Sequence, residues 1–189
     1  MPPKNLILAI TGASGSLYAK LLFRELEKHQ NQIGLAACLF SGNAPGIWQH
    51  ELDEKPKIPP GFTQYALNDF NSPLASGSSD FNTMIICPCS MGTIGRIAAG
   101  TSDDLLLRAA DVMLKEKRKL ILVPRETPFN LIHLRNMTTL TEAGATIIPA
   151  IPSFYSRPGN INELAMTVVD RILAHAGIKD DGRFAWGHE

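Results

Sequence analysis

Short apolar runs recur along the whole chain, and longer segments of mixed polarity separate them. The runs are five to eight residues long, and each has Gly, Pro, Asn or Ser at one or both of its ends. Apolar runs of this length are typical of strands that are buried on both faces of a sheet. They predict β-strands at 5–10, 33–40, 83–87, 119–123 and 145–149.

The segments between these runs carry apolar residues at the three- and four-residue spacing of a helix face. Helices are expected at 16–29, 43–52, 90–99, 102–116, 130–143 and 160–176, with Ser90 and Ser102 as N-caps. Strands that alternate with helices form a parallel sheet covered on both faces. We therefore expect an α/β fold with a single doubly wound, mostly parallel sheet, Rossmann-like or flavodoxin-like. Two segments rich in Pro, Gly or Ser, 55–61 and 74–79, are expected to be loops.

The composition is that of one ordinary globular domain. The chain has 189 residues, of which 44% are hydrophobic and 19% charged, so a single domain over 1–189 with a polar tail from about 177 is expected. Eighteen basic residues balance eighteen acidic ones, which argues against a nucleic-acid-binding protein. No apolar run has the length of a membrane span or a signal-peptide core, so we expect a cytoplasmic protein with no membrane partner.

Cys87-Pro88-Cys89 is the one grouping that suggests a metal. Two thiols without a second Cys or His pair make weak evidence for zinc. Buried small residues at a strand end explain them better, and no metal site is predicted.

Small and hydroxylated residues follow the first and third predicted strands. Gly12, Ala13, Ser14 and Gly15 stand at the first strand-to-helix turn, where glycines let a ligand approach and the helix N-terminus favours an anion. The segment 90–93, Ser-Met-Gly-Thr, follows the third strand in the same way. Such turns suit the phosphate and the polar ring edge of a flavin. A merely structural turn at 12–15, and a simple helix cap at 90–93, remain alternatives.

A cation and a carboxylate, Arg125 and Glu126, stand side by side after the fourth strand. Open α/β sheets place their chemistry at the carboxyl ends of their strands, so a functional role is favoured over a surface salt bridge. Arg108 and Lys115 lie two helical turns apart and can project from one face, although a solvated helix face would also explain them.

The last third of the chain adds aromatic and basic side chains. The loop 153–158 contains Tyr155 and Arg157, Arg171 follows on the final predicted helix, and Trp186 stands in the polar tail. Surface pairing with Asp170 is the alternative explanation for Arg171. Trp186 has no core helix around it and is expected to close a neighbouring pocket.

Taken in order, these residues resemble the flavin prenyltransferase family of the UbiX type, from about Asn5 to Ala176. The most specific segments are Leu107-Arg108-Ala109-Ala110-Asp111-Val112-Met113-Leu114-Lys115-Glu116 and Val123-Pro124-Arg125-Glu126-Thr127-Pro128-Phe129, joined by 11–15, 87–90 and 154–155. The sequence departs from the family at Gly42, where relatives often have lysine, at Arg157 and in the tail. These departures concern the edge and the closure of the pocket.

The resemblance implies an enzyme that joins a dimethylallyl group from dimethylallyl monophosphate to N5 and C6 of reduced FMN. The product, prenylated FMN, would serve a UbiD-type decarboxylase. The family also implies a homododecamer with sites between neighbouring subunits. Because the chain lacks the paired-aspartate run of magnesium-dependent prenyl transfer, we expect a metal-independent reaction.

Residue roles are implied by position. The implied FMN contacts are Gly12, Ala13, Ser14, Ser41, Ser90, Met91, Gly92, Thr93 and Arg125. The implied contacts to the prenyl phosphate are Lys115, Glu126, Tyr155, Arg171, Arg108 and Trp186. The implied catalytic residues are Glu126, Lys115, Tyr155, Arg171 and Glu51.

Three other functions stay open at this point. A related FMN-dependent cysteine decarboxylase would share the fold and the flavin, but its catalytic histidine and substrate-clamping loop are not found here. Direct decarboxylation of aromatic acids is a second alternative. A non-catalytic flavin carrier is the third, although storage would not need the second phosphate pocket that Lys115, Arg125 and Glu126 suggest.

Overall fold

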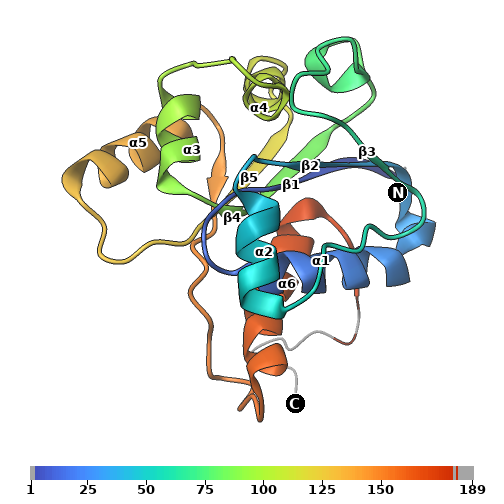
Figure 1. The fold of residues 1–189 in the computed structure, drawn as a ribbon, viewed down its shortest axis with the longest axis vertical. Coiled ribbons are helices and arrows are strands. Elements are labelled where there is room, and N and C mark those ends of the chain that lie inside the picture. The colour runs from blue at the N-terminus through green and yellow to red at the C-terminus, as the bar shows by residue number, and fades with distance from the viewer. Residues whose placement is uncertain (1–2, 181, 183–189) are drawn as a thin grey trace.

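The computed structural model describes residues 3–180 and 182, and within them one parallel sheet carries six α-helices (Figure 1). The strands are β1 (Lys4–Ile10), β2 (Ile33–Phe40), β3 (Phe62–Gln64), β4 (Thr83–Cys89), β5 (Lys119–Pro124) and β6 (Thr146–Ile147). The helices are α1 (Ser16–Lys28), α2 (Ala44–Leu52), α3 (Met91–Ala98), α4 (Leu105–Lys115), α5 (Leu131–Glu142) and α6 (Ile161–Ala176). The predicted α/β fold is confirmed.

The strand order is β3-β2-β1-β4-β5-β6, and every pair is parallel. The chain winds outward from β1 in one direction and then, from β4, in the other. A crevice is expected where the winding reverses, at the carboxyl ends of β1 and β4. This switch point lies where the sequence places its two small-residue turns.

Alternate residues of each strand feed two separate cores, because successive strand side chains point to opposite faces. Leu6, Leu8 and Ile10 of β1 pack with α1, α2 and α6, whereas Ile7 and Ala9 pack with α3, α4 and α5. Figure 1 shows the same division, with α1, α2 and α6 below the sheet and α3, α4 and α5 above it.

Several predicted boundaries change. β3 is an additional strand of three residues directly after the breaker-rich segment 55–61, too short to stand out from its apolar pattern. β6 covers only Thr146–Ile147 of the predicted 145–149. Ser102 does not cap the fourth helix as expected. Asp104 does so instead, because its carboxylate accepts a hydrogen bond of 2.8 Å from the N–H of Leu107.

Candidate active site at the switch point

Thr11 joins the two turns that meet at the switch point. Its buried hydroxyl donates to the carbonyl of Pro88 at 2.8 Å and accepts from the N–H of Ser90 at 2.8 Å. Its own N–H donates to the same Pro88 carbonyl at 3.2 Å. The end of β1 and the end of β4 are therefore held in a fixed relation.

The first turn needs glycine at two positions. A Cβ on Gly12 would lie 2.7 Å from the Cβ of Asn43, and Gly15 has a φ of +115°, which side-chain-bearing residues rarely adopt. These constraints bring the backbone of 12–15 close to the segment that begins α2.

Glu51 of α2 closes the N-terminus of α1. Its carboxylate accepts hydrogen bonds from the N–H of Gly15 at 3.0 Å and from the N–H of Ser16 at 2.7 Å. Burial by itself raises the pKa of Glu51. Hydrogen bonds from the Ser14 hydroxyl, the two amides and the Ser16 hydroxyl outweigh burial, so the pKa is lowered. Because Glu51 occupies the amides of Gly15 and Ser16, an anionic ligand at this turn would be bound by the amides of residues 12–14. The described part of the chain provides these amides with no hydrogen-bond partner.

The second turn opens α3. Ser90 is the N-cap, as predicted: its hydroxyl accepts from the N–H of Thr93 at 3.2 Å and lies 3.0 Å from the Thr93 hydroxyl. Met91 and Thr93 are buried, whereas Gly92 is exposed. A Cβ on Gly92 would meet only the Ser90 hydroxyl oxygen, at 3.9 Å. The backbone at Gly92 is therefore accessible to a flat ligand.

Ser41 and Arg125 flank these turns. The N–H of Ser41 extends the hydrogen-bond ladder between β1 and β2 by donating to the Ile10 carbonyl at 2.9 Å. The N–H of Arg125 donates to the Cys89 carbonyl at 3.3 Å. The predicted FMN contacts thus all follow the carboxyl ends of β1, β2, β4 and β5, which are neighbours at one edge of the sheet. Glu126 is exposed beside Arg125, and its carboxylate accepts from the N–H of Thr127 at 3.0 Å.

Tyr18 is a candidate that sequence reasoning missed. Burial, followed by the nearby Cys87, raises the pKa of its phenol, and the charge of Arg125 opposes that rise. Tyr18 also lines a cavity of about 590 Å³ together with Ser14 and Glu51. The available signal was its place one turn after Ser14 on the first helix.

Arg108 and Lys115 both face the loop 74–79, in agreement with their predicted common face. The Nε of Arg108 donates to the Ala75 carbonyl at 3.0 Å, and its guanidinium pairs with Asp111 at 2.7 Å. Lys115 pairs with Glu116, and a Cβ on Gly77 would lie 2.7 Å from the Lys115 ammonium.

The loop 74–79 therefore adds hydroxyls beside the predicted phosphate cations. The hydroxyls of Ser76 and Ser78 lie 2.8 Å apart, and the loop is close to Lys115. The sequence predicts a loop here, but its serines were assigned no role. A run of hydroxyls next to a basic helix face was the signal that could have found them.

The remaining predicted substrate residues do not join Lys115 within one chain. Lys115 ends α4 on one face of the sheet, whereas Arg171 is exposed on α6, which covers the other face (Figure 1). Tyr155 is 70% exposed on the segment between β6 and α6 that extends away from the sheet (Figure 1). Trp186 lies outside the described residues. The sheet thus separates two groups of residues that were predicted to act together.

The cysteines are buried and unpaired with one another, at Cys38, Cys87 and Cys89. Burial raises the pKa of Cys38 to about 12 and also raises the pKa of the other two thiols. This agrees with their interpretation as packed small residues. In residues 3–180 and 182, no three His, Cys, Asp or Glu side chains gather as a metal site would require, and no helix has the length and apolarity to span a membrane.

The family model and the similar proteins agree on one kind of protein, a flavoprotein. The family model described as Flavoprotein matches residues 1–177. The chain is 45% identical over 185 residues to the flavin prenyltransferase UbiX of Methanocaldococcus jannaschii, covering 97% of this chain and 98% of that protein.

Two solved structures are similar in fold and sequence. The dodecameric FMN-dependent Ubix-like decarboxylase of Escherichia coli O157:H7 has a TM-score of 0.88 at 34% identity, covering 96% of this chain and 98% of that one. AnUbiX (PadA1), in complex with FMN and dimethylallyl pyrophosphate, has a TM-score of 0.85 at 34% identity, covering 97% and 99%.

Proposed function

Because the chain belongs to the Flavoprotein family and, within it, to the UbiX flavin prenyltransferases, we propose that it prenylates reduced FMN. The dimethylallyl group of dimethylallyl monophosphate is transferred to N5 and C6 of the flavin. The carbon–oxygen bond of the donor breaks and inorganic phosphate leaves. The observation that carries the proposal is the pair of accessible small-residue turns that Thr11 links at the switch point.

The described residues fit a flavin at this edge of the sheet. Free amides at 12–14 and the exposed backbone at Gly92 suit a phosphate and a polar ring edge, and Arg125 adds a cation at the same edge of the sheet. We assign FMN binding to Gly12, Ala13, Ser14, Ser41, Ser90, Met91, Gly92, Thr93 and Arg125. Bound there, the reduced flavin supplies the nucleophile that accepts the prenyl group.

The donor's phosphate requires cations. As it leaves, negative charge concentrates on its oxygens, so cations aimed at it stabilise the transition state more than the ground state. We assign this role to Lys115 and Arg171, with the neutral phenol of Tyr155 as a hydrogen-bond donor to the phosphate and with Arg108 and Trp186 completing the pocket. Glu126 holds or relays a proton at the leaving phosphate. Glu51 is assigned near the flavin, where it orders the first turn.

These donor residues converge only if another subunit supplies part of the site, because α4 and α6 lie on opposite faces of one sheet. We propose a homododecamer with sites between subunits. The exposed side chains of Ile151, Phe154, Tyr155 and Ile161, each at least 70% exposed, support an extensive interface. Exposed Leu131 and Ile132 on α5 add to the apolar surface.

The product is proposed to serve a UbiD-type decarboxylase, and the cytoplasm is proposed as the compartment. Both assignments rest on the sequence argument. The proposed reaction uses no metal ion.

The decisive experiment is anaerobic incubation of the purified protein with reduced FMN and dimethylallyl monophosphate. We expect the flavin to gain the mass of one dimethylallyl unit, with and without a chelator. An unchanged flavin, together with release of carbon dioxide from a cysteine-terminated peptide, would replace this proposal with the decarboxylase alternative.

A further inference from the structure

Arg118 is a basic residue to which the proposed reaction assigns no role, and its backbone is fixed at the end of α4. Lys117 has a φ of +53°, which ends the helix and reverses the chain. The N–H of Lys117 donates to the Leu114 carbonyl at 3.0 Å, and the N–H of Arg118 donates to the Met113 carbonyl at 2.7 Å. These are the two hydrogen bonds of a Schellman motif. Arg118 is therefore held in a fixed relation to Lys115, the last residue of α4.

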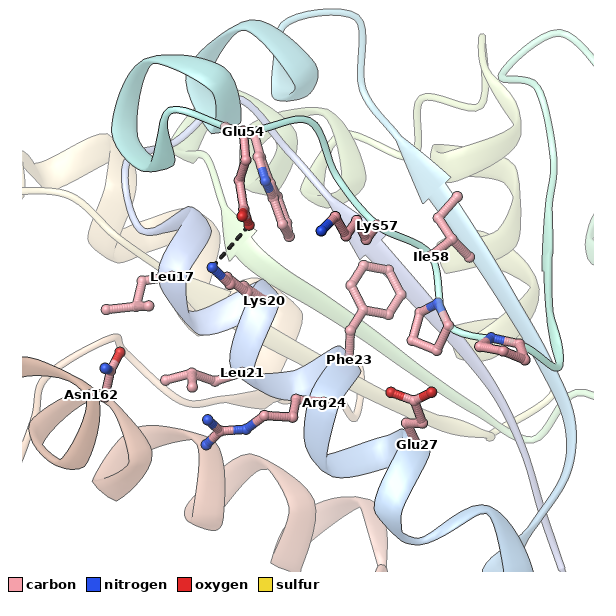
Figure 2. Close-up of a pocket in the computed structure, with 13 residues that line it drawn as sticks. Leu17, Lys20, Leu21, Phe23, Arg24, Glu27, Glu54, Lys57, Ile58 and Asn162 are labelled. Atoms are coloured by element: carbon pink, nitrogen blue, oxygen red, sulfur yellow. Dashed lines mark ion pairs between the residues drawn. The ribbon is translucent and has the colours of Figure 1, made fainter.

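The guanidinium of Arg118 binds backbone carbonyls and not a carboxylate. It donates to the Phe81 carbonyl at 2.9 Å and, through its other terminal nitrogen, to the Gly77 carbonyl. Among the residues that the structure describes, no carboxylate forms an ion pair with it. Lys20 shows the commoner arrangement, an ion pair of 2.9 Å with Glu54 across the hollow between α1 and the segment 53–61 (Figure 2). The rigid fork of a guanidinium can hold two carbonyls at once.

The two carbonyls that Arg118 holds differ in how firmly the rest of the protein fixes them. The side chain of Phe81 is buried in the core on the α4 side of the sheet, just before β4. Gly77 lies in the loop 74–79, whose neighbouring residues Ser76 and Ser78 are exposed. Arg118 therefore ties an exposed loop to a buried anchor.

The loop 74–79 approaches Lys115 closely at the residue that Arg118 holds. A Cβ on Gly77 would lie 2.7 Å from the Lys115 ammonium. Arg108 also holds the loop, but at its beginning, where its Nε donates to the Ala75 carbonyl at 3.0 Å. The position of Gly77 relative to the ammonium therefore depends on Arg118.

We propose that Arg118 is a positioning residue for the phosphate of the prenyl donor. It acts through the loop 74–79, which it holds beside Lys115, so that the loop and the ammonium present one fixed surface to the phosphate. The inference rests on the proposed function, which assigns Lys115 to this phosphate. A misplaced contact of this kind weakens substrate binding even where the contacting side chain itself is intact.

Hydrogen exchange in the full-length, FMN-loaded protein tests the hold on the loop without any reaction. We expect Arg118→Gln to speed deuterium uptake in 74–79, because the carbonyl of Gly77 loses its donor, and to leave uptake in α3 unchanged. Uptake in 74–79 equal to that of the unmodified protein would overturn the inference.

Steady-state kinetics test the consequence for the donor. Arg118→Gln is expected to raise the KM for dimethylallyl monophosphate about tenfold, with a smaller change in kcat and an unchanged Kd for FMN. A lower unfolding temperature and flavin content at an unchanged KM would show a purely structural role and overturn the inference. If the unmodified protein forms no prenylated flavin, the proposed function fails, and the exchange measurement still decides whether Arg118 holds the loop.

Two further variants separate the fork from its charge. Arg118→Lys keeps the positive charge, but a single ammonium does not reproduce the fork, so we expect the same rise in KM as in Arg118→Gln. A normal KM in Arg118→Lys would show that charge alone matters and would overturn the inference. Lys119→Gln is the matched control, because Lys119 also donates to a backbone carbonyl, that of His175 on α6. Its KM should be normal, and a rise equal to that of Arg118→Gln would contradict a specific role for Arg118.

Discussion

The hydroxyl of Thr11 accepts a hydrogen bond from the backbone N–H of Ser90 at 2.8 Å, across 79 positions of sequence. The same hydroxyl donates to the Pro88 carbonyl, so one buried side chain sets the spacing between the two turns assigned to the flavin. Thr11 touches no proposed ligand itself. It is a positioning residue whose contribution is a fixed distance between β1 and β4.

Replacing Thr11 with Val keeps its shape and leaves the partly buried N–H of Ser90 without its acceptor. We expect a loss of about 1–3 kcal/mol in the free energy of unfolding and a lower content of bound FMN after purification. Thr11→Ser, which keeps the hydroxyl, is the matched control and should resemble the unmodified protein. Full flavin content in Thr11→Val would remove the positioning role.

Glu51→Gln tests whether the negative charge of Glu51 stabilises the N-terminus of α1. Since the folded pKa of Glu51 is lowered, the carboxylate stabilises the fold fully above its unfolded pKa, and this contribution is lost as pH falls through the folded pKa. We expect Glu51→Gln to lower the free energy of unfolding by about 1–2 kcal/mol at neutral pH. The difference should shrink below pH ~4.

Denaturant unfolding at several pH values measures this effect. Glu54→Gln is the control, because Glu54 forms only the partly exposed ion pair with Lys20, which contributes less. A Glu51→Gln deficit that stays constant through the acid range would show that shape, and not charge, matters at this position.

Gly92→Ala is expected to affect FMN binding without lowering the stability of the fold. The added methyl group meets no atom closer than the Ser90 hydroxyl oxygen, and alanine favours a helix over glycine by about 1 kcal/mol. We expect equal or higher stability and reduced FMN binding, because the methyl group blocks the exposed backbone. Gly12→Ala provides the contrast: its 2.7 Å contact with Asn43 should destabilise the protein itself. Unchanged FMN affinity in Gly92→Ala would exclude close approach of the flavin.

Lys115→Ala and Glu126→Gln are expected to retain FMN and to lose prenylation by about a hundredfold or more, because each removes an interaction that strengthens as phosphate leaves. Lys117→Ala is the control on the same helix end. Lys117 is exposed and has a φ of +53°. Lysine and alanine are equally strained at this φ, so the substitution changes the charge without changing the backbone strain. Mass analysis of the flavin gives the readout, and normal product formation in both variants would refute these roles.

Much of the fold could be predicted because it depends on local patterns. β1 and α1 are visible as an apolar run followed by a leucine stripe, and the Ser90 cap as a hydroxyl before a helix. β3 was missed because three residues carry too little periodicity to predict a strand. Pairing with β2, which the local sequence does not indicate, makes this segment a strand.

The candidate site was less predictable, because its contacts join distant segments. Glu51 was assigned from the family resemblance, but its bonds to Gly15 and Ser16 depend on how α2 packs against α1. The loop 74–79 reaches Lys115 only after η2 (Pro73–Ala75) and α4 pack together. The separation of Lys115 from Arg171 follows from the winding of the sheet. The direction of winding cannot be predicted from a short motif.

That separation has a genetic consequence. If a working centre takes Lys115 from one chain and Arg171 from another, a chain defective at the first position and a chain defective at the second can each supply what the other lacks. Co-expression of the two inactive mutants would then restore partial activity in mixed assemblies, a case of complementation between alleles of one gene.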